Sequence, residues 1–196
     1  NPNDVKSVNV FKDAALAYIY GVKGGSGVIV ITTKSGKRNS ETKFTLSTSV
    51  GTKEVVKTID VLNASEYTAI LNEASVNAGE GIVFPNISDF GVGTNWQDEV
   101  LVDAPIINHS VTASGGSANT SYYVSAGYTG QDGVVAGGEK SFFNRTNFTT
   151  NINTDLTKKT ELLVNTNYSN IKGKGLPENG ITSVLSNALN FDTTVN

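Results

Sequence analysis

The glycine-rich segment from Gly21 to Gly27 is the first feature of this sequence that could bind a ligand. Phosphate-binding loops place their glycines after a strand and before a helix, so that the helix N-terminus faces the anion. Here the expected order is helix, glycines and strand, and no G-x-x-x-x-G-K-[ST] motif is present. The glycines are better explained as a tight turn that requires positive φ angles.

The histidine and one acidic cluster are the next candidates for chemistry. His109 is the only histidine, but it falls on the apolar side of an alternating segment, and no G-x-S-x-G motif accompanies it. Three acidic residues lie near Trp96 and could act as paired carboxylates. They are Asp98, Glu99 and Asp103. Without a second catalytic group nearby in the sequence, they indicate a solvated acidic loop.

A calcium-binding loop is the remaining possibility. Asn151, Asn153 and Asp155 alternate as the first ligands of such a loop do. The glycine required at the sixth position is Leu156, however, and the bidentate glutamate required at the twelfth is Leu162. We therefore predict no catalytic residue, no metal site and no cofactor site, and we do not expect an enzyme.

Composition limits the class of protein further. The chain has no cysteine, so disulfides and thiolate metal sites are excluded. Only 17% of its residues are charged and its net charge is −3, which argues against a nucleic-acid partner. No run of 18 apolar residues is present, which excludes a transmembrane helix. Transmembrane β-strands remain possible because their alternating pattern is a weak signal.

The N-terminal segment is predicted to be a small α/β element. A short apolar run around Val8 should form a strand, and Asp13 should cap a helix over 14–20. Val28–Thr33 is β-branched throughout and does not alternate, which predicts a strand buried on both faces. Because some thirty residues cannot bury a stable core alone, another part of the protein must surround this element.

The rest of the chain is dominated by segments in which apolar and polar residues alternate. A period of two places successive side chains on opposite faces of a strand. Val111, Val124 and Val164 fall on apolar faces, whereas Thr112, Ser125 and Asn165 fall on polar faces. Short and long connections alternate, as they do in outer-membrane barrels. The five segments are 43–51, 107–114, 121–129, 142–153 and 160–170, each close to the roughly 9–11 residues that a tilted strand needs to cross a bilayer.

Two of the long connections carry helical patterns. Asn63, with Glu66 three residues later, predicts a helix start with a capping box. The second helix is predicted over 181–189. The expected buried face of the first helix has the spacing i, i+3, i+4 and i+7 and consists of Tyr67, Ile70, Leu71 and Ala74.

Segment 5–37 carries a series of short motifs. They are Lys12-Asp13-Ala14, Ile19-Tyr20-Gly21, Gly24, Gly27-Val28-Ile29 and Ile31-Thr32-Thr33-Lys34. With these motifs the segment resembles the end of the plug domain of SusC/RagA-type TonB-dependent outer-membrane transporters. Departures from that family's pattern are modest: Lys23 replaces arginine, Gly25-Ser26 replaces Ala-Asn, and Phe11 replaces leucine. Further similar motifs are 95–100, Ala104-Pro105, 108–111, 114–117 and Tyr122-Tyr123.

The resemblance implies a mainly β fold: a transmembrane antiparallel β-barrel segment preceded by the C-terminal part of an α/β plug domain. Residues 1–38 would form the plug part and residues 43–196 the first strands and loops of a barrel of about 22 strands. The resemblance also implies import of glycans or peptides, a SusD-like surface lipoprotein, coupling to TonB through a region before Asn1, and contact with outer-membrane lipid. The cell would be a Gram-negative, Bacteroidetes-like bacterium.

One alternative from another class stays open. The alternating pattern also suits a soluble β-rich binding or adhesion module without a transport role. A barrel would need detergent for extraction from the membrane, whereas a soluble module would not. Because the chain opens at Asn1-Pro2 with neither a start methionine nor a signal peptide, we expect it to be part of a longer precursor. No substrate-contacting residue can be assigned from the sequence.

Overall fold

The computed structural model describes residues 1–196 except 13–20, 22, 25–26, 178–179 and 196. The chain divides into two compact units, each built from three segments. The first, which we call the sheet unit, comprises Asn1–Val50, Ile107–Gly130 and Asn144–Lys172. The second, the loop unit, comprises Gly51–Ile106, Gln131–Phe143 and Gly173–Asn196.

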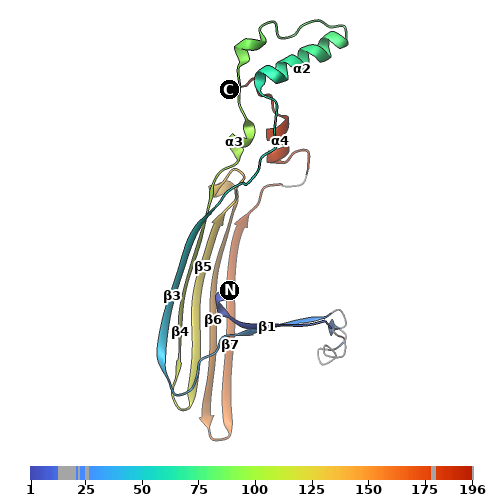
Figure 1. The fold of residues 1–196 in the computed structure, drawn as a ribbon. Coiled ribbons are helices and arrows are strands. Elements are labelled where there is room, and N and C mark those ends of the chain that lie inside the picture. The colour runs from blue at the N-terminus through green and yellow to red at the C-terminus, as the bar shows by residue number, and fades with distance from the viewer. Residues whose placement is uncertain (13–20, 22, 25–26, 178–179, 196) are drawn as a thin grey trace. The chain divides into compact units, whose positions relative to one another are not determined.

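A five-stranded sheet is the largest element of the fold, and its strands are neighbours in chain order (Figure 1). The sequence predicted all five strands, but each is longer than predicted, at 13 to 16 residues. The turns after β4 and β6 are only a few residues long, so each of these strands is antiparallel to the next. The strands are β3 (Ser40–Lys53), β4 (Ala104–Gly116), β5 (Thr120–Asp132), β6 (Phe142–Thr157) and β7 (Thr160–Lys174).

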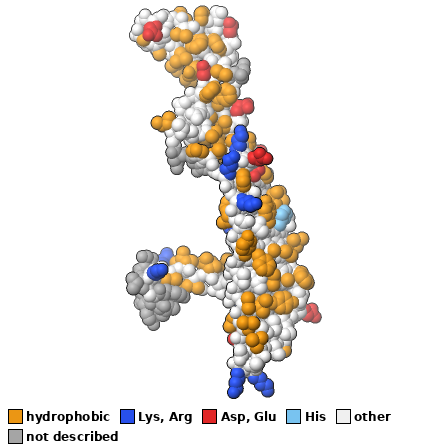
Figure 2. Space-filling view, turned by 180° about the vertical axis from the view of Figure 1, so that it is seen from behind, with side chains coloured by type: hydrophobic (Ala, Val, Ile, Leu, Met, Phe, Trp, Pro, Cys, Tyr) orange, Lys and Arg blue, Asp and Glu red, His pale blue; other side chains and the backbone are white. Residues whose placement is uncertain are grey.

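The two faces of this sheet differ in the way that the alternation predicts. On one face, which we call the apolar face, hydrophobic side chains are open to solvent, and Figure 2 shows them gathered over the sheet. Phe44 and Leu46 are each about three-quarters exposed there. On the other, the polar face, the buried side chains are Ser110, Ser121, Tyr123, Ser125, Asn147, Thr149 and Asn151. A water-soluble sheet would instead bury its hydrophobic side chains and expose its polar ones.

A separate two-stranded hairpin precedes the sheet. Its strands are β1 (Val5–Phe11) and β2 (Val28–Thr33), which run antiparallel with an irregularity between Val5 and Ser7. A short 3-10 helix, η1 (Pro2–Asp4), leads into β1. The helix predicted over 14–20 and its Asp13 cap lie outside the described residues.

The strand predicted at β2 is confirmed, but its predicted burial on both faces is wrong. Ile29 is 66% exposed and Ile31 is 60% exposed. The reason is that, among the described residues, β2 pairs only with β1, and a two-stranded ribbon covers neither of its own faces. The hairpin therefore presents apolar surface that the described residues leave open.

The positive φ predicted for the glycine turn is confirmed at Gly21 (+72°) and Gly27 (+101°). A Cβ atom at Gly27 would also lie 3.1 Å from the carbonyl oxygen of Phe11. We expect Gly27→Val to destabilise the hairpin by about 2 kcal/mol, because a β-branched residue tolerates this backbone conformation poorly. Hydrogen exchange of the β2 amides in the full-length protein measures this loss.

A matched control is Gly175→Val, since Gly175 has no positive φ and no other atom lies within 4 Å of the place that an added Cβ would take. In that variant, the β2 amides should exchange hydrogen at the same rate as in the parent protein. Equal protection of β2 in both variants would contradict the strained-turn explanation. Binding of phosphate that disappeared with Gly27→Val would contradict it as well.

The loop unit contains the helix α2 (Ala64–Asn77), which begins as the sequence predicts. The Asn63 side chain accepts a hydrogen bond from the Glu66 amide at 2.9 Å. The Glu66 carboxylate in turn accepts one from the Asn63 amide at 3.0 Å. This reciprocal pair satisfies two of the N–H groups that a helix start leaves open.

The buried face predicted for α2 is correct only in part, because Tyr67 and Leu71 are partly buried but Ile70 and Ala74 are exposed. The residues that pack inward are Ala64, Thr68 and Asn72, whereas Ile70 is half exposed. The cause is the connection after the helix, whose backbone needs hydrogen-bond partners. The Asn72 carboxamide supplies them, accepting from the amides of Val83 and Phe84 and donating to the carbonyl of Phe84 at 2.8–2.9 Å. Hydrogen bonding thus decides which side of this helix is buried.

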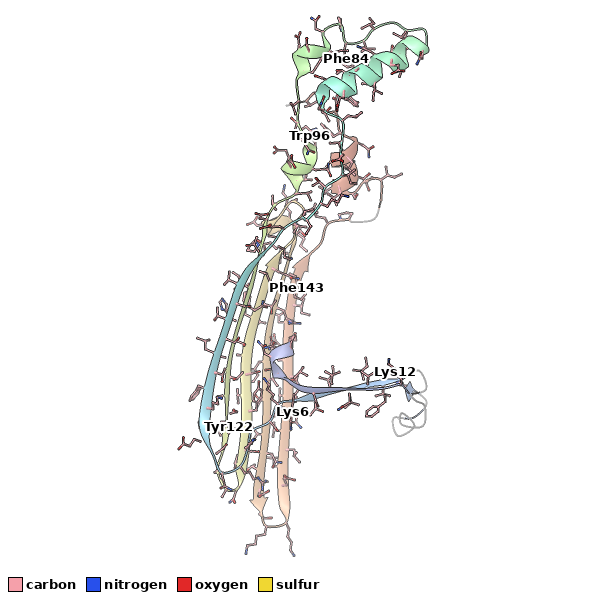
Figure 3. The ribbon with its side chains drawn as sticks, in the orientation of Figure 1. Lys6, Lys12, Phe84, Trp96, Tyr122 and Phe143 are labelled. Carbon is pink, nitrogen blue, oxygen red and sulfur yellow. The ribbon has the colours of Figure 1, made fainter. Side chains whose placement is uncertain are left out.

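Short helices complete the loop unit. The predicted second helix appears as α4 (Val184–Asn190), capped by Ser183, and it contacts α3 (Trp96–Val100). Trp96, labelled in Figure 3, stacks edge-on against Phe191 at 5.0 Å and donates to the Asp192 carbonyl at 3.0 Å. Two 3-10 turns, η4 (Ile87–Phe90) and η5 (Gly138–Lys140), lie in the connections. Among the described residues, no helix is long and apolar enough to cross a membrane.

Candidate functional site

The polar face of the sheet binds the N-terminal segment through a buried carboxylate. Asp4 is only 2% exposed. The Tyr123 hydroxyl donates to one of its carboxylate oxygens at 2.8 Å, and the Thr149 hydroxyl donates to the other at 3.2 Å. A buried carboxylate is costly unless donors surround it, so these two hydroxyls explain why Asp4 can lie here. Asp4 thus links η1 to strands β5 and β6.

The second strand of the hairpin is held to the same face where it leaves the hairpin, beside Asp4. The Asn151 carboxamide donates to the Lys34 carbonyl at 2.6 Å and to the Thr33 hydroxyl at 3.0 Å. Lys34 also joins the two ends of the hairpin, because its amide donates to the Asp4 carbonyl at 2.8 Å. Asn3 adds a contact to β4 by donating to the Ser110 hydroxyl at 3.1 Å. Three neighbouring strands therefore hold the open end of the hairpin, where β1 begins and β2 ends.

The connection from β2 to β3 lies close to the sheet backbone. A Cβ atom at Gly36 would fall within 2.6 Å of backbone atoms of Tyr122 and Gly115, so only glycine fits there. Arg38 follows, and its guanidinium donates to Asp155 at 2.7 Å and to Asn153 at 3.1 Å. The connection is therefore fixed by close packing as well as by charge.

The structure brings together the three residues considered for calcium, but the N-terminal segment already binds them. Asn151 contacts Thr33 and Lys34, while Asn153 and Asp155 contact Arg38. Within the described part of the chain, no group of three or more histidine, cysteine or acidic residues could hold a metal ion. The polar face thus uses these side chains to bind polypeptide.

The other candidates, where the structure describes them, make no contact with Asp4 or Asn151. His109 lies exposed on the apolar face, where its Nδ1 atom is 3.3 Å from the Thr48 hydroxyl. Asp98, in α3, accepts a hydrogen bond from the Asn95 side chain at 2.9 Å. In the described part of the glycine turn, the Gly27 amide donates to the Gly24 carbonyl at 2.9 Å, which is the geometry of a turn.

Sequence reasoning missed the central pair, Asp4 and Tyr123. One signal for it existed. Tyr123 is a large aromatic residue on the otherwise small and polar side of β5, between Ser121 and Ser125. A tyrosine buried there needs a partner for its hydroxyl. The partner itself is 119 positions away, beyond the reach of any local pattern.

Comparisons with known proteins agree with this arrangement. No family model matches the chain. TonB-dependent receptor P3 of Formosa agariphila is 37% identical over 164 residues, which cover 84% of this chain and 15% of the receptor. TonB-dependent receptor SusC of Bacteroides thetaiotaomicron is 37% identical over 154 residues, which cover 78% of this chain and 14% of SusC.

Solved structures show the same fold. A structure of the RagAB peptide transporter has a TM-score of 0.82 and 22% identity, covering 99% of this chain and 25% of that one. The RagAB peptide importer in its open-open state has a TM-score of 0.73 and 25% identity, covering 93% of this chain and 24% of that one. The sheet of this chain is not closed into a barrel, since its five strands end at β3 and β7.

These similarities cover most of the chain but only a small part of each relative. The chain spans about 15% of the length of the curated receptors that it matches. The resemblance seen in its plug-like segment is thereby confirmed, and the relatives are named as receptors and importers, not as enzymes. The chain belongs to the SusC/RagA-type TonB-dependent receptors.

Proposed function

We propose that this chain contributes to an outer-membrane transporter that imports nutrients through a plugged β-barrel. Residues 1–38 would be the C-terminal part of the plug, and residues 43–196 would be the first strands and loops of the barrel. The observation that carries this proposal is the two-faced sheet. Its polar face binds the N-terminal segment through Asp4 and Asn151, while its apolar face stays open.

The dimensions of the strands support the same conclusion. A tilted strand needs roughly 9–11 residues to cross the hydrocarbon core of a bilayer, and the strands here have 13 to 16. In such a barrel the outward side chains are apolar and the inward ones are polar. A soluble sandwich or adhesion module would instead cover Phe44 and Leu46 with a second sheet.

The activity and partners proposed for the whole receptor follow from its relatives. RagAB is described as a peptide importer and SusC as a TonB-dependent receptor. We propose glycans or peptides as substrates, a SusD-like lipoprotein at the outer surface, and TonB acting through a region before residue 1. The protein would reside in the outer membrane of a Gram-negative, Bacteroidetes-like bacterium. Its chemistry would be binding and gated passage, with no bond made or broken.

Two measurements on the full-length receptor in its native host test this proposal. The receptor should be extracted from membranes only with detergent, because its apolar face meets lipid. Deleting the receptor gene should abolish growth on at least one member of a panel of glycans and peptides, and a proton uncoupler should abolish uptake of that nutrient by the parent strain. Extraction without detergent, as a cooperatively folding soluble protein, would contradict the proposal and favour the soluble module.

A further inference from the structure

Arg145 is a charged side chain of the polar face that the contacts described above do not use. It lies in β6, and its Nε atom is buried without a hydrogen-bond partner among the described residues. Two residues further along the same face, the Nδ2 atom of Asn147 is in the same condition, and Asn147 is only 6% exposed. Both atoms are donors, so what is missing beside them is an acceptor.

Arg145 lines a cavity of about 300 Å³ in the sheet unit. Apart from Pro2 and His109, the surrounding side chains are amides and hydroxyls, which suit a polar ligand, and no acidic side chain is among the lining residues. Asn147 is close by, since its carboxamide and that of Asn1 both approach the Cβ position of Gly127 within 3.1 Å. Polar residues that line the cavity with Arg145 include Asn1, Asn3, Ser47, Ser49 and Asn108.

The nearby carboxylates of this face already have partners. Asp4 accepts from Tyr123 and Thr149. Asp155 lies 2.7 Å from the Arg38 guanidinium and Glu161 lies 3.7 Å from it. Among the described residues, no carboxylate lies within salt-bridge distance of Arg145. A half-buried guanidinium without a counter-ion is unfavourable, which points to an anion supplied from elsewhere.

We propose that Arg145, assisted by Asn147, binds a carboxylate or another oxyanion in this cavity. The guanidinium fork matches the geometry of such a group, and the surrounding amides can donate to its remaining lone pairs. The oxyanion comes either from the imported solute or from an acidic side chain elsewhere in the same receptor. This inference rests on the proposed function only for the first of these sources.

The test compares Arg145→Gln and Arg145→Lys in the full-length receptor, with Lys159→Gln as the matched control. Lys159 is an exposed cation in the turn between β6 and β7, so its loss changes the net charge equally without altering the cavity. The probes are tetragalacturonate with maltotetraose as its neutral counterpart, and an acidic tetrapeptide with its amidated form. Binding is measured by titration calorimetry, and stability by thermal unfolding and protease resistance of the plug.

If the solute supplies the oxyanion, an acidic probe should bind about ten- to a hundredfold more tightly than its neutral counterpart. Arg145→Gln should remove this preference, and Arg145→Lys should keep part of it. If the receptor supplies the oxyanion, the acidic and neutral probes should not differ, but Arg145→Gln should lower the unfolding temperature and expose the plug to protease.

The proposal is wrong if Arg145→Gln matches Lys159→Gln in probe preference, unfolding temperature and protease resistance together. The proposed transport function has a separate test, because loss of nutrient uptake on gene deletion does not depend on Arg145. A receptor that imports a nutrient normally with Arg145→Gln and shows none of these changes would leave transport standing and overturn the anion site.

Discussion

Replacing Asp4 with alanine should detach the N-terminal segment from the sheet. The substitution removes the acceptor for the buried hydroxyl of Tyr123 and one of the two acceptors within reach of the Thr149 hydroxyl. A hydrogen bond to a charged group contributes about 1.5–3 kcal/mol, so we expect the attached state to lose about 3–5 kcal/mol. Hydrogen exchange of the β1 amides in the full-length receptor should then accelerate by a factor of about a hundred or more.

Two further variants show whether this loss comes from the contact itself. Asp4→Asn keeps the shape of the side chain and one acceptor oxygen. It should therefore destabilise the attached state less than Asp4→Ala does. Glu41→Ala removes an exposed carboxylate from β3 and should leave exchange in β1 unchanged. If the β1 amides exchanged hydrogen no faster in Asp4→Ala than in the parent receptor, the Asp4 contact would not be what holds the hairpin.

Introducing arginine on the apolar face should be far more damaging than introducing it on the polar face. Val111 and Thr112 are neighbours near the middle of β4, and Val111 is 48% exposed on the apolar face. Near mid-bilayer, an arginine that faces lipid costs about 2–4 kcal/mol. We therefore expect Val111→Arg to lower the free energy of unfolding by that amount and Thr112→Arg to lower it much less. Denaturant unfolding of the full-length receptor in lipid vesicles measures both values.

This pair is a cleaner test than the neighbouring Val124 and Ser125. Ser125 has the predicted orientation, but it is only 1% exposed, so an arginine there would clash with protein. Equal losses for Val111→Arg and Thr112→Arg would mean that the apolar face does not meet lipid. A larger loss for Thr112→Arg would reverse the assignment of the two faces.

The sequence predicts the strands well because their pattern is local. A period of two is visible within a single segment, and it assigns Val111 to one face and Thr112 to the other without knowledge of any partner. The same holds for the start of α2, where Asn63 and Glu66 lie only three positions apart. Strand lengths were underestimated because polar residues near the strand ends, such as Thr120 and Thr157, look like turn residues.

The missed features depend on other parts of the chain. The buried side of α2 follows from Asn72 satisfying the amides of Val83 and Phe84, which hydrophobic spacing does not register. The exposure of Ile29 and Ile31 follows from the absence of a third strand beside β2 within the described chain. The buried Asp4 requires Tyr123 and Thr149, each more than a hundred positions away.

The chain order of the five-stranded sheet has a consequence for how the protein is assembled. Each strand pairs with the one made just before it, so the loops that must close between β4 and β5 and between β6 and β7 are short and cost little entropy. The contacts of Asp4 and Asn151 span 117 to 145 positions and need β5 and β6 in place first. We therefore expect strand pairing to come early in biogenesis and seating of the N-terminal segment to come late.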